Sequence, residues 1–372
     1  MQANRDDEDH ETALATGNTT LRAGISATAK SLPARVRFAM SAPLLPWHRQ
    51  TLPLLLLAVA VVLPTPVKAA DAVSHGNRNV EADEPAQAAF VSGALDNAVA
   101  LRREALRASL SNVAGDPAAA AQAMASLARL YIDEDRYLDA EPLLLAARQL
   151  LAEHEDGNSA AMAVIQASLA RVDLARGDVK PAVACATEAA ALVQRDADDV
   201  SSEPLRVLGS ALAADHQYAR GDKVLQQAVA RARAEFGPQS LETARDLAEL
   251  ARLYLHADRP AEALPLIEEA TAIDQHLFAR GHPFIGDDLL DLGLIYEALK
   301  KPELAKRAMI AAFDSLEGGA ARDTPRVAYV ETDLSRVLRE AGETEAADAA
   351  FADARRILKK TEAEERKRER DA

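Results

Sequence analysis

The pentapeptide LARLY occurs twice, at residues 127–131 and 250–254, and this repetition decides how the rest of the chain is interpreted. When its first leucine is taken as a reference position, matching leucines recur every 42 residues, apart from one interval of 39. These reference leucines are Leu127, Leu169, Leu208, Leu250, Leu292 and Leu334. A fixed period of this length is typical of architectures in which each unit stacks on its neighbours.

The layout around each reference leucine predicts two helices per unit. Met124, Leu127, Ala128 and Tyr131 fall at the spacing of one helical stripe, and a second stripe of small and apolar residues begins thirteen residues after the leucine. A turn separates the two stripes at Asp135, Gly177, Asp258 or Gly342, and the connections between units carry further breakers such as Gly237-Pro238. Each unit is therefore expected to be an antiparallel helix pair.

This pattern closely resembles the tetratricopeptide repeat family. The period and the stretch GHPFIGDDLLDLGLIYEALKKPELAKRA at 281–308 are similar to the longer repeats of kinesin light chains. The resemblance implies an all-α, right-handed α-solenoid of about six stacked helix pairs over residues 120–356. We expect a capping helix at 89–119 and a charged helical tail at 357–372, because the terminal faces of a solenoid must be covered.

The N-terminal region is expected to lie outside the fold. Residues 54–63 form an apolar run of ten, which suits the hydrophobic region of a signal peptide better than a membrane span of about 20 residues. Small residues before Ala70 fit a cleavage site at Ala69, and Met40 offers a start that makes 40–69 a signal peptide. Residues 1–39 would then be a doubtful extension and 70–88 a flexible linker. The alternative is an uncleaved membrane anchor at 52–67.

Composition excludes several classes of function. The net charge of −15 argues against a nucleic-acid-binding protein, and the single cysteine, Cys185, excludes an intramolecular disulfide framework. We find no glycine-rich phosphate loop, no nucleophile motif and no cluster of metal ligands, so neither a cofactor nor a metal is expected. The sequence predicts a protein that is not an enzyme.

Arginine stands two positions after the reference leucine in four of the six units, as Arg129, Arg171, Arg252 and Arg336. That position points away from the apolar stripe of its own helix, given 100° per residue. Two interpretations remain open. The arginines can be solvated and paired within their helices, as Arg129 with Asp133 and Arg336 with Glu340. Alternatively, they form a row on the concave face that binds carboxylates or phosphates of a partner.

The leading functional hypothesis is a non-enzymatic scaffold or adaptor, periplasmic or secreted, that binds a protein or peptide, such as an acidic one, in its concave groove. The alternatives are a regulatory receptor for a small peptide or ligand, and an assembly factor anchored in the inner membrane if segment 54–63 stays uncleaved. The asparagines with which related repeats hold a ligand's backbone are missing before the reference leucines, where Glu249, Asp291 and Asp333 stand instead. The ligands of those relatives are therefore not carried over.

Overall fold

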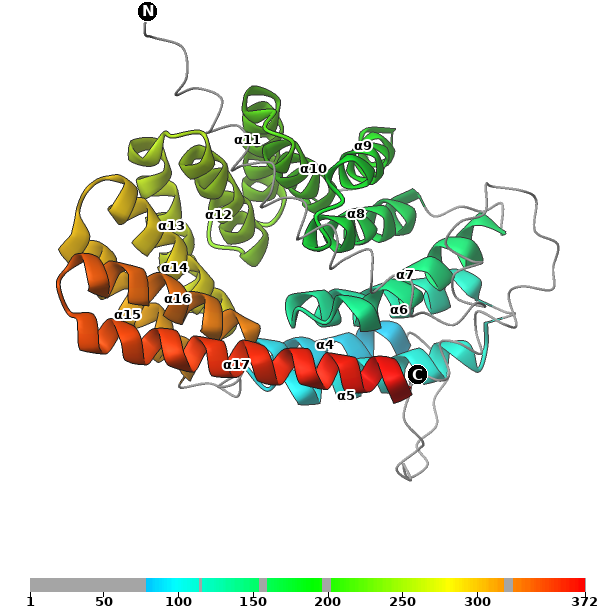
Figure 1. The fold of residues 1–372 in the computed structure, drawn as a ribbon. Coiled ribbons are helices and arrows are strands. Elements are labelled where there is room, and N and C mark those ends of the chain that lie inside the picture. Colours follow the sequence, from blue (N-terminus) through cyan, green and yellow to red (C-terminus); the bar gives the residue numbers. More distant parts are fainter. Residues whose placement is uncertain (1–77, 114–115, 154–158, 196–201, 318–323, 372) are drawn as a thin grey trace, which may run out of the picture. The chain divides into compact units, whose positions relative to one another are not determined.

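The computed structural model describes residues 78–113, 116–153, 159–195, 202–317 and 324–371, and within these ranges every regular element is a helix (Figure 1). The first helices are α4 (Arg78–Val91), α5 (Leu95–Leu110), α6 (Pro117–Asp133), α7 (Tyr137–Ala152), α8 (Ser159–Ala175), α9 (Val179–Arg195) and α10 (Glu203–Ala214). They are followed by α11 (Tyr218–Glu235), α12 (Leu241–His256), α13 (Pro260–Leu277), α14 (Pro283–Ala298), α15 (Pro302–Glu317), α16 (Pro325–Glu340) and α17 (Thr344–Asp371). The predicted all-α solenoid is confirmed.

Consecutive helices pack as pairs, and the six reference leucines mark six repeats. Repeat 1 is α6 with α7, repeat 2 is α8 with α9, and the series continues to repeat 6, which is α16 with α17. Within repeat 6, Ala354 and Ile357 of α17 share an apolar cluster with Val327 and Val330 of α16. One further pair, α4 with α5, precedes repeat 1 and packs on α6.

The turn inside each repeat has the same backbone conformation. The residue eight positions after each reference leucine has a positive φ, at Asp135, Gly177, His216, Asp258, Lys300 and Gly342. Only glycine adopts this left-handed region without a steric penalty, so the four other residues are held there by the surrounding helix pair. The turn can be predicted from the sequence where glycine or aspartate occupies this position, but not where His216 or Lys300 does.

Small side chains allow the two helices of a repeat to approach closely. A Cβ atom built on Gly209 of α10 would lie 2.3 Å from Cγ of Leu225 on α11, well inside van der Waals contact. The equivalent Gly293 of α14 would meet Met309 of α15 at 2.7 Å. The small residue that follows each reference leucine is therefore a packing requirement of the repeat, as its recurrence in the sequence indicates.

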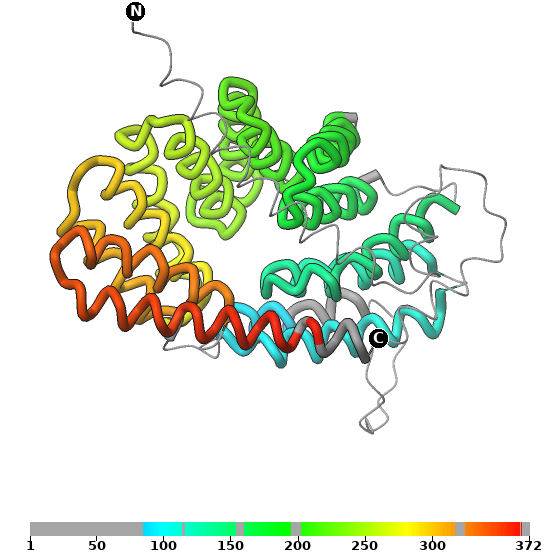
Figure 2. Tube along the Cα trace, in the orientation of Figure 1, coloured from blue at the N-terminus to red at the C-terminus, as the bar shows by residue number. Residues whose placement is uncertain are grey.

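The first helices of successive repeats form the inner side of the array. α6 contacts α8, α8 contacts α10, α10 contacts α12 and α12 contacts α14, in addition to the contacts that each makes within its own repeat. Figure 2 follows this course from α6 in cyan-green to α16 in orange. Side chains that point away from the core of a first helix therefore face the inner side, where the arginines at the second position after each reference leucine lie.

The chain divides into a main unit, Gln50–Thr361, and a second unit that holds Glu362–Ala372. Within the main unit, α4 packs against the corner between α13 and α14, more than 180 residues further along the chain. The buried ring of Phe90 lies edge-on to the rings of Phe278, His282 and Phe284, with centroid distances of 6.1, 5.1 and 5.5 Å. These four residues form the closure cluster.

Two hydrogen bonds accompany the closure cluster. The Nε2–H of His282 donates to the carbonyl oxygen of Phe90 at 3.1 Å, since Nδ1 of the same ring accepts from the backbone N–H of Phe284. The backbone N–H of Ala279 donates to the carbonyl oxygen of Val91 at 3.3 Å. Burial lowers the pKa of His282 to about 4, so the ring is neutral at neutral pH and suits this bonding.

The N-terminal boundary differs from the expectation. A flexible linker was expected at 70–88 and a capping helix at 89–119, but α4 begins at Arg78 and a turn at 92–94 separates it from α5. The structure thus has a helix hairpin where one helix was expected. The turn is required because Phe90 must reach the α13–α14 corner while Leu106 of α5 is buried in the same core cluster beside α6.

The proposed start at Met40, the signal peptide at 40–69 and its apolar run at 54–63 lie outside the described residues. Among the helices that are described, none has the length and apolar character needed to cross a membrane.

We predict that Phe90→Ala loosens the closure cluster. Removing a buried phenyl ring leaves a cavity, which should lower the free energy of unfolding by about 3 kcal/mol and open α4 locally. Urea unfolding and hydrogen exchange of residues 85–95 and 278–285 measure the two effects. Leu138→Ala is the control, since that side chain is 60% exposed and should change stability by less than about 0.5 kcal/mol. Unchanged exchange at 278–285 would contradict the closure.

Candidate binding site on the inner face

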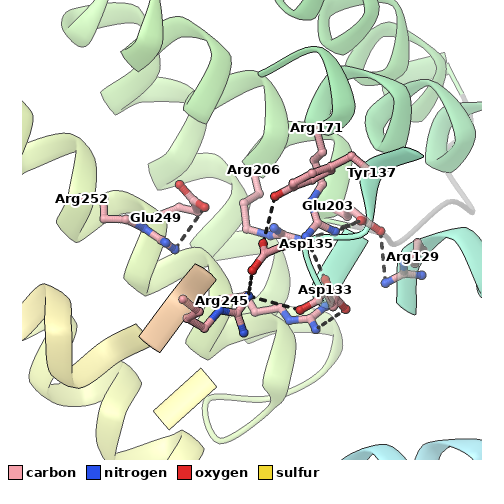
Figure 3. Close-up of polar contacts among 11 residues, drawn as sticks. Arg129, Asp133, Asp135, Tyr137, Arg171, Glu203, Arg206, Arg245, Glu249 and Arg252 are labelled. Carbon is pink, nitrogen blue, oxygen red and sulfur yellow. Dashed lines mark hydrogen bonds and ion pairs between the residues drawn. The ribbon is translucent and has the colours of Figure 1, made fainter. Parts of the chain in front are cut away.

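Charged side chains from four successive first helices meet on the inner side of the array (Figure 3). We call this set the inner-face charge network. It consists of Arg129 and Asp133 of α6, Arg171 of α8, Glu203 and Arg206 of α10, and Arg245, Asp246, Glu249 and Arg252 of α12. Arg129, Arg171 and Arg252 recur two positions after a reference leucine, and equivalent positions of stacked first helices face the same side; the other members of the network stand at other positions of the repeat.

The structure places Arg129 and Arg171 beside one shared carboxylate. Nη2 of Arg129 lies 3.3 Å from Oε2 of Glu203, and Nη1 of Arg171 lies 3.9 Å from Oε1 of the same residue. Arg171 also donates a hydrogen bond of 2.8 Å to Oδ1 of Asp133. The pairing of Arg129 with Asp133 within one helix, considered from the sequence, is replaced by pairing across repeats.

Arg252 and Arg336 pair with acids of their own and of neighbouring repeats. Nη2 of Arg252 lies 3.1 Å from Glu249, and its Nε lies 3.6 Å from Asp291 of α14. Arg336 is bound by Glu297 of α14 and, at 3.0 Å, by Asp333 of its own helix. The structure therefore groups Arg129, Arg171 and Arg252 in one network, and Arg336 stands apart from them at the α14–α16 contact.

A spacing rule underlies these pairs. The residue two positions after a reference leucine reaches the residue immediately before the next reference leucine, as when the hydroxyl of Ser210 donates to Glu249 at 2.8 Å and Arg252 faces Asp291. Glu249, Asp291 and Asp333 all stand immediately before a reference leucine. These acids were noticed in the sequence only as replacements for asparagine, although their offset from the arginines could have identified them as partners.

Asp133 connects repeats that are far apart in the sequence. Its carboxylate accepts from Arg171, and its other oxygen lies 3.3 Å from Nη2 of Arg245 on α12. Nη2 of Arg326, at the start of α16, donates to the backbone carbonyl oxygen of Asp133 at 3.2 Å. Burial works to raise the pKa of Asp133, but the guanidiniums of Arg245 and Arg171 outweigh it and hold the pKa far below its usual range.

Arg326 and Arg245 extend this connection toward α14. Arg326 lies 3.3 Å from both Asp135 of repeat 1 and Asp287 of α14. The guanidinium of Arg245 lies over the ring of Phe284, 4.6 Å from its centroid. The inner-face charge network and the closure cluster are thus physically continuous, and both oppose opening of the array.

Buried carboxyl groups on α13 and α14 carry raised pKa values. Burial raises the pKa of Asp274 and of Asp291 to about 7, and that of Asp288 well above its usual range with the help of the other two carboxyls. One oxygen of Asp274 and one of Asp288 have no hydrogen-bond partner. No group of three or more histidine, cysteine or acidic side chains among the described residues has an arrangement that could hold a metal ion.

Stacked antiparallel helix pairs with an inner face built by the first helices define the molecule as a helical repeat solenoid. Residues 202–276, which contain repeats 3 and 4 from α10 to α13, match the family model described as tetratricopeptide repeat. Over this stretch the chain matches the tetratricopeptide repeat, which confirms the resemblance that the sequence pattern indicated. A search among curated proteins finds no match.

Two of the matching solved structures share the fold at low sequence identity, and a third is similar to part of this chain. A Rap protein complexed with Competence and Sporulation Factor is 11% identical, with a TM-score of 0.59 and coverage of 75% of this chain and 76% of that chain. Aspartyl phosphate phosphatase F from Bacillus subtilis is 14% identical, with a TM-score of 0.51 and coverage of 75% and 70%. The repeats of a putative kinesin light chain from Podosopora anserina are 22% identical, with a TM-score of 0.44 and coverage of 53% and 95%.

We predict that Asp133→Asn destabilises the protein by about 3 kcal/mol, because Arg171 and Arg245 lose the carboxylate that compensates their burial. The loss should appear in urea unfolding, and hydrogen exchange should increase at the start of α16, where Arg326 binds the same turn. Asp348→Asn removes an exposed carboxylate that pairs with Arg339, and this control should cost less than about 0.5 kcal/mol. Equal effects of the two substitutions would contradict the central role of Asp133.

A pH dependence follows from Asp274. Its carboxyl keeps a proton up to about pH 7 in the folded protein but only to about pH 4 when unfolded, so raising the pH from 5 to 8 favours unfolding. We expect Asp274→Asn to gain about 2 kcal/mol of stability relative to the original protein over this range. Urea unfolding of both proteins at several pH values measures this difference, in which contributions common to both, such as that of His282, cancel. Parallel stability curves would contradict the prediction.

Proposed function

We propose that this chain is a non-enzymatic protein-binding scaffold of the cell envelope, exported through its segment at 40–69. Its inner face takes an acidic segment of a partner protein, and Arg129, Arg171, Arg252 and Arg336 supply the positive charge. The proposal uses the property of helical repeat arrays that the curved inner side offers an extended binding surface.

One observation carries the proposal. The side chains of Arg129, Arg252 and Arg336 remain 38%, 38% and 41% exposed, although each lies within 4 Å of an acid. A guanidinium has five N–H donors in a planar fork, and the pairs described above use only part of them. The row of arginines therefore keeps N–H donors that can bind a carboxylate of a partner. Because the protein as a whole is acidic, it repels anions in general, and only an anion that reaches these arginines is attracted.

Arg171 has a different part in this proposal. Its side chain is 23% exposed and is held by the hydrogen bond to Asp133, so it contributes to the architecture as well as to the charge of the face. Burial alone would lower the pKa of Arg171, but Asp133 and Glu203 raise it, so the guanidinium stays charged. For this reason a test of binding should spare Arg171 and replace the three more exposed arginines.

We expect the combined variant Arg129→Gln, Arg252→Gln, Arg336→Gln to fold but to lose most of its partner. Tagged protein captured from the envelope fraction, with co-purified proteins quantified by mass spectrometry, measures this loss, and circular dichroism checks the fold. The matched control replaces Arg233, Arg259 and Arg339, which are of similar exposure but lie outside the network, by glutamine. Recovery of the same proteins by both variants, or absence of the protein from the envelope fraction, would refute the proposal.

A further inference from the structure

Three arginines from three different helices surround the carboxylate of Glu203. Nη2 of Arg129 on α6 lies 3.3 Å from Oε2, while Nη1 of Arg171 on α8 and Nη2 of Arg206 on α10 lie 3.9 and 3.8 Å from Oε1 (Figure 3). The side chain of Glu203 is only 7% exposed. One negative charge thus sits among three positive charges from repeats 1, 2 and 3.

The fit of Glu203 among these arginines is loose. Oε1 is buried and has no hydrogen-bond partner, although two guanidiniums lie within 4 Å of it. By contrast, Arg171 reaches Asp133 with a hydrogen bond of 2.8 Å. Burial acts to raise the pKa of Glu203, but Arg129 and Arg206 lower it below its ordinary value, so the group stays charged. The carboxylate is held by charge and lacks the directed bonds that guanidinium forks usually make.

The spacing rule of the repeats explains why Glu203 stands alone. Repeats 4 to 6 have an acid immediately before the reference leucine, whereas the equivalent residues of repeats 1 to 3 are Ser126, Ser168 and Val207. Arg129 and Arg171 therefore lack the acid that serves Arg252 in the next repeat. A single carboxylate, from the first residue of α10, compensates for those missing acids.

Neighbouring acids hold two of the arginines in position independently of Glu203. Asp133 binds Arg171, and Oδ1 of Asp246 lies 3.1 Å from Nε of Arg206. Burial raises the pKa of Asp246 to about 6, and Arg206 opposes this rise. Because this pKa is still below 7, the carboxylate is mainly ionised at neutral pH. If Glu203 left, Arg171 and Arg206 would keep these contacts, and Arg129, the most exposed of the three, would face the entering group.

We propose that Arg129, Arg171 and Arg206 form a carboxylate-binding site that Glu203 fills in the free protein and that a glutamate or aspartate side chain of the partner takes over. This inference rests on the proposed function, because it specifies how the inner face receives an acidic segment. A change of the Glu203 side-chain rotamer withdraws its carboxylate without unwinding α10. Glu203 therefore competes with the partner and weakens binding.

The substitution Glu203→Gln tests this competition, because it removes the charge and keeps the shape. We expect a fluorescein-labelled oligoglutamate peptide to bind Glu203→Gln about tenfold more tightly than the original protein in fluorescence polarisation at low salt, as one added charged hydrogen bond allows. Adding Arg129→Gln to Glu203→Gln should cancel the gain. The control Glu269→Gln removes a carboxylate that pairs with Arg233 outside the inner-face charge network, and it should leave peptide binding within about twofold of the original.

Inorganic phosphate gives a second readout that does not depend on a peptide. Without Glu203 the three guanidiniums repel one another, so Glu203→Gln should melt at a lower temperature than the original protein in chloride. Phosphate at matched ionic strength should restore the melting temperature of Glu203→Gln and leave that of Glu269→Gln unchanged. A variant that does not fold in chloride can be tested in the same way after refolding in phosphate.

The possible results separate this inference from the proposed function. Equal peptide affinities together with no effect of phosphate would overturn the anion site. A response to phosphate without a gain for the peptide would overturn the acidic segment as ligand and leave a site for small free anions. If both readouts respond as expected while the triple glutamine variant still captures its partner, the site exists and the proposed function is wrong.

Discussion

The carboxylate of Asp133 is the contact on which the arrangement of the repeats depends most. It lies at the end of α6 in repeat 1 and binds Arg171 of repeat 2 and Arg245 of repeat 4, while the adjacent backbone carbonyl binds Arg326 of repeat 6. Units in a solenoid ordinarily contact only their immediate neighbours. Here one acid joins first helices that are separated by up to 193 residues.

The closure cluster reinforces the same arrangement with apolar surface. Phe90 packs on Phe278 and Phe284, and Arg245 lies over Phe284 on one side while it binds Asp133 on the other. Charge and apolar packing therefore constrain the same curvature. The charged groups of the inner-face charge network can be buried because each is paired with a group of opposite charge. Asp274 and Asp288 lack such complete pairing, so burial raises their pKa values.

The repeat could be predicted from the sequence because its determinants are local. The reference leucines, the small residue after each of them and the turn eight residues later depend on contacts within one helix pair, so they recur with the period. The closure could not be predicted, since Phe90 and Asp133 meet their partners only after small rotations between repeats have accumulated. Nothing in the local pattern around Phe90 distinguishes it from an ordinary apolar residue of a capping helix.

The candidate site, like the fold, could be predicted from the sequence only in part. The recurring position identified Arg129, Arg171, Arg252 and Arg336, but Arg206 and Arg245 lie off that position and carried no periodic signal. Glu203 could not be predicted for a related reason. It compensates for the acids that repeats 1 to 3 lack immediately before the reference leucine. A search for the residue type that is missing from a recurring position, as well as for the type that recurs, would have directed attention to α10.

The contacts between repeat 1 and repeats 4 and 6 also bear on how this chain could evolve. An open solenoid gains or loses units by duplication or deletion with little effect on the remaining ones. In this chain an added unit between repeats 1 and 4 would displace Arg245 and Arg326 from Asp133 and carry the α13–α14 corner away from Phe90. The number of repeats is therefore fixed by the geometry of closure, and descendants of this chain are expected to vary in side chains and loops before they vary in copy number.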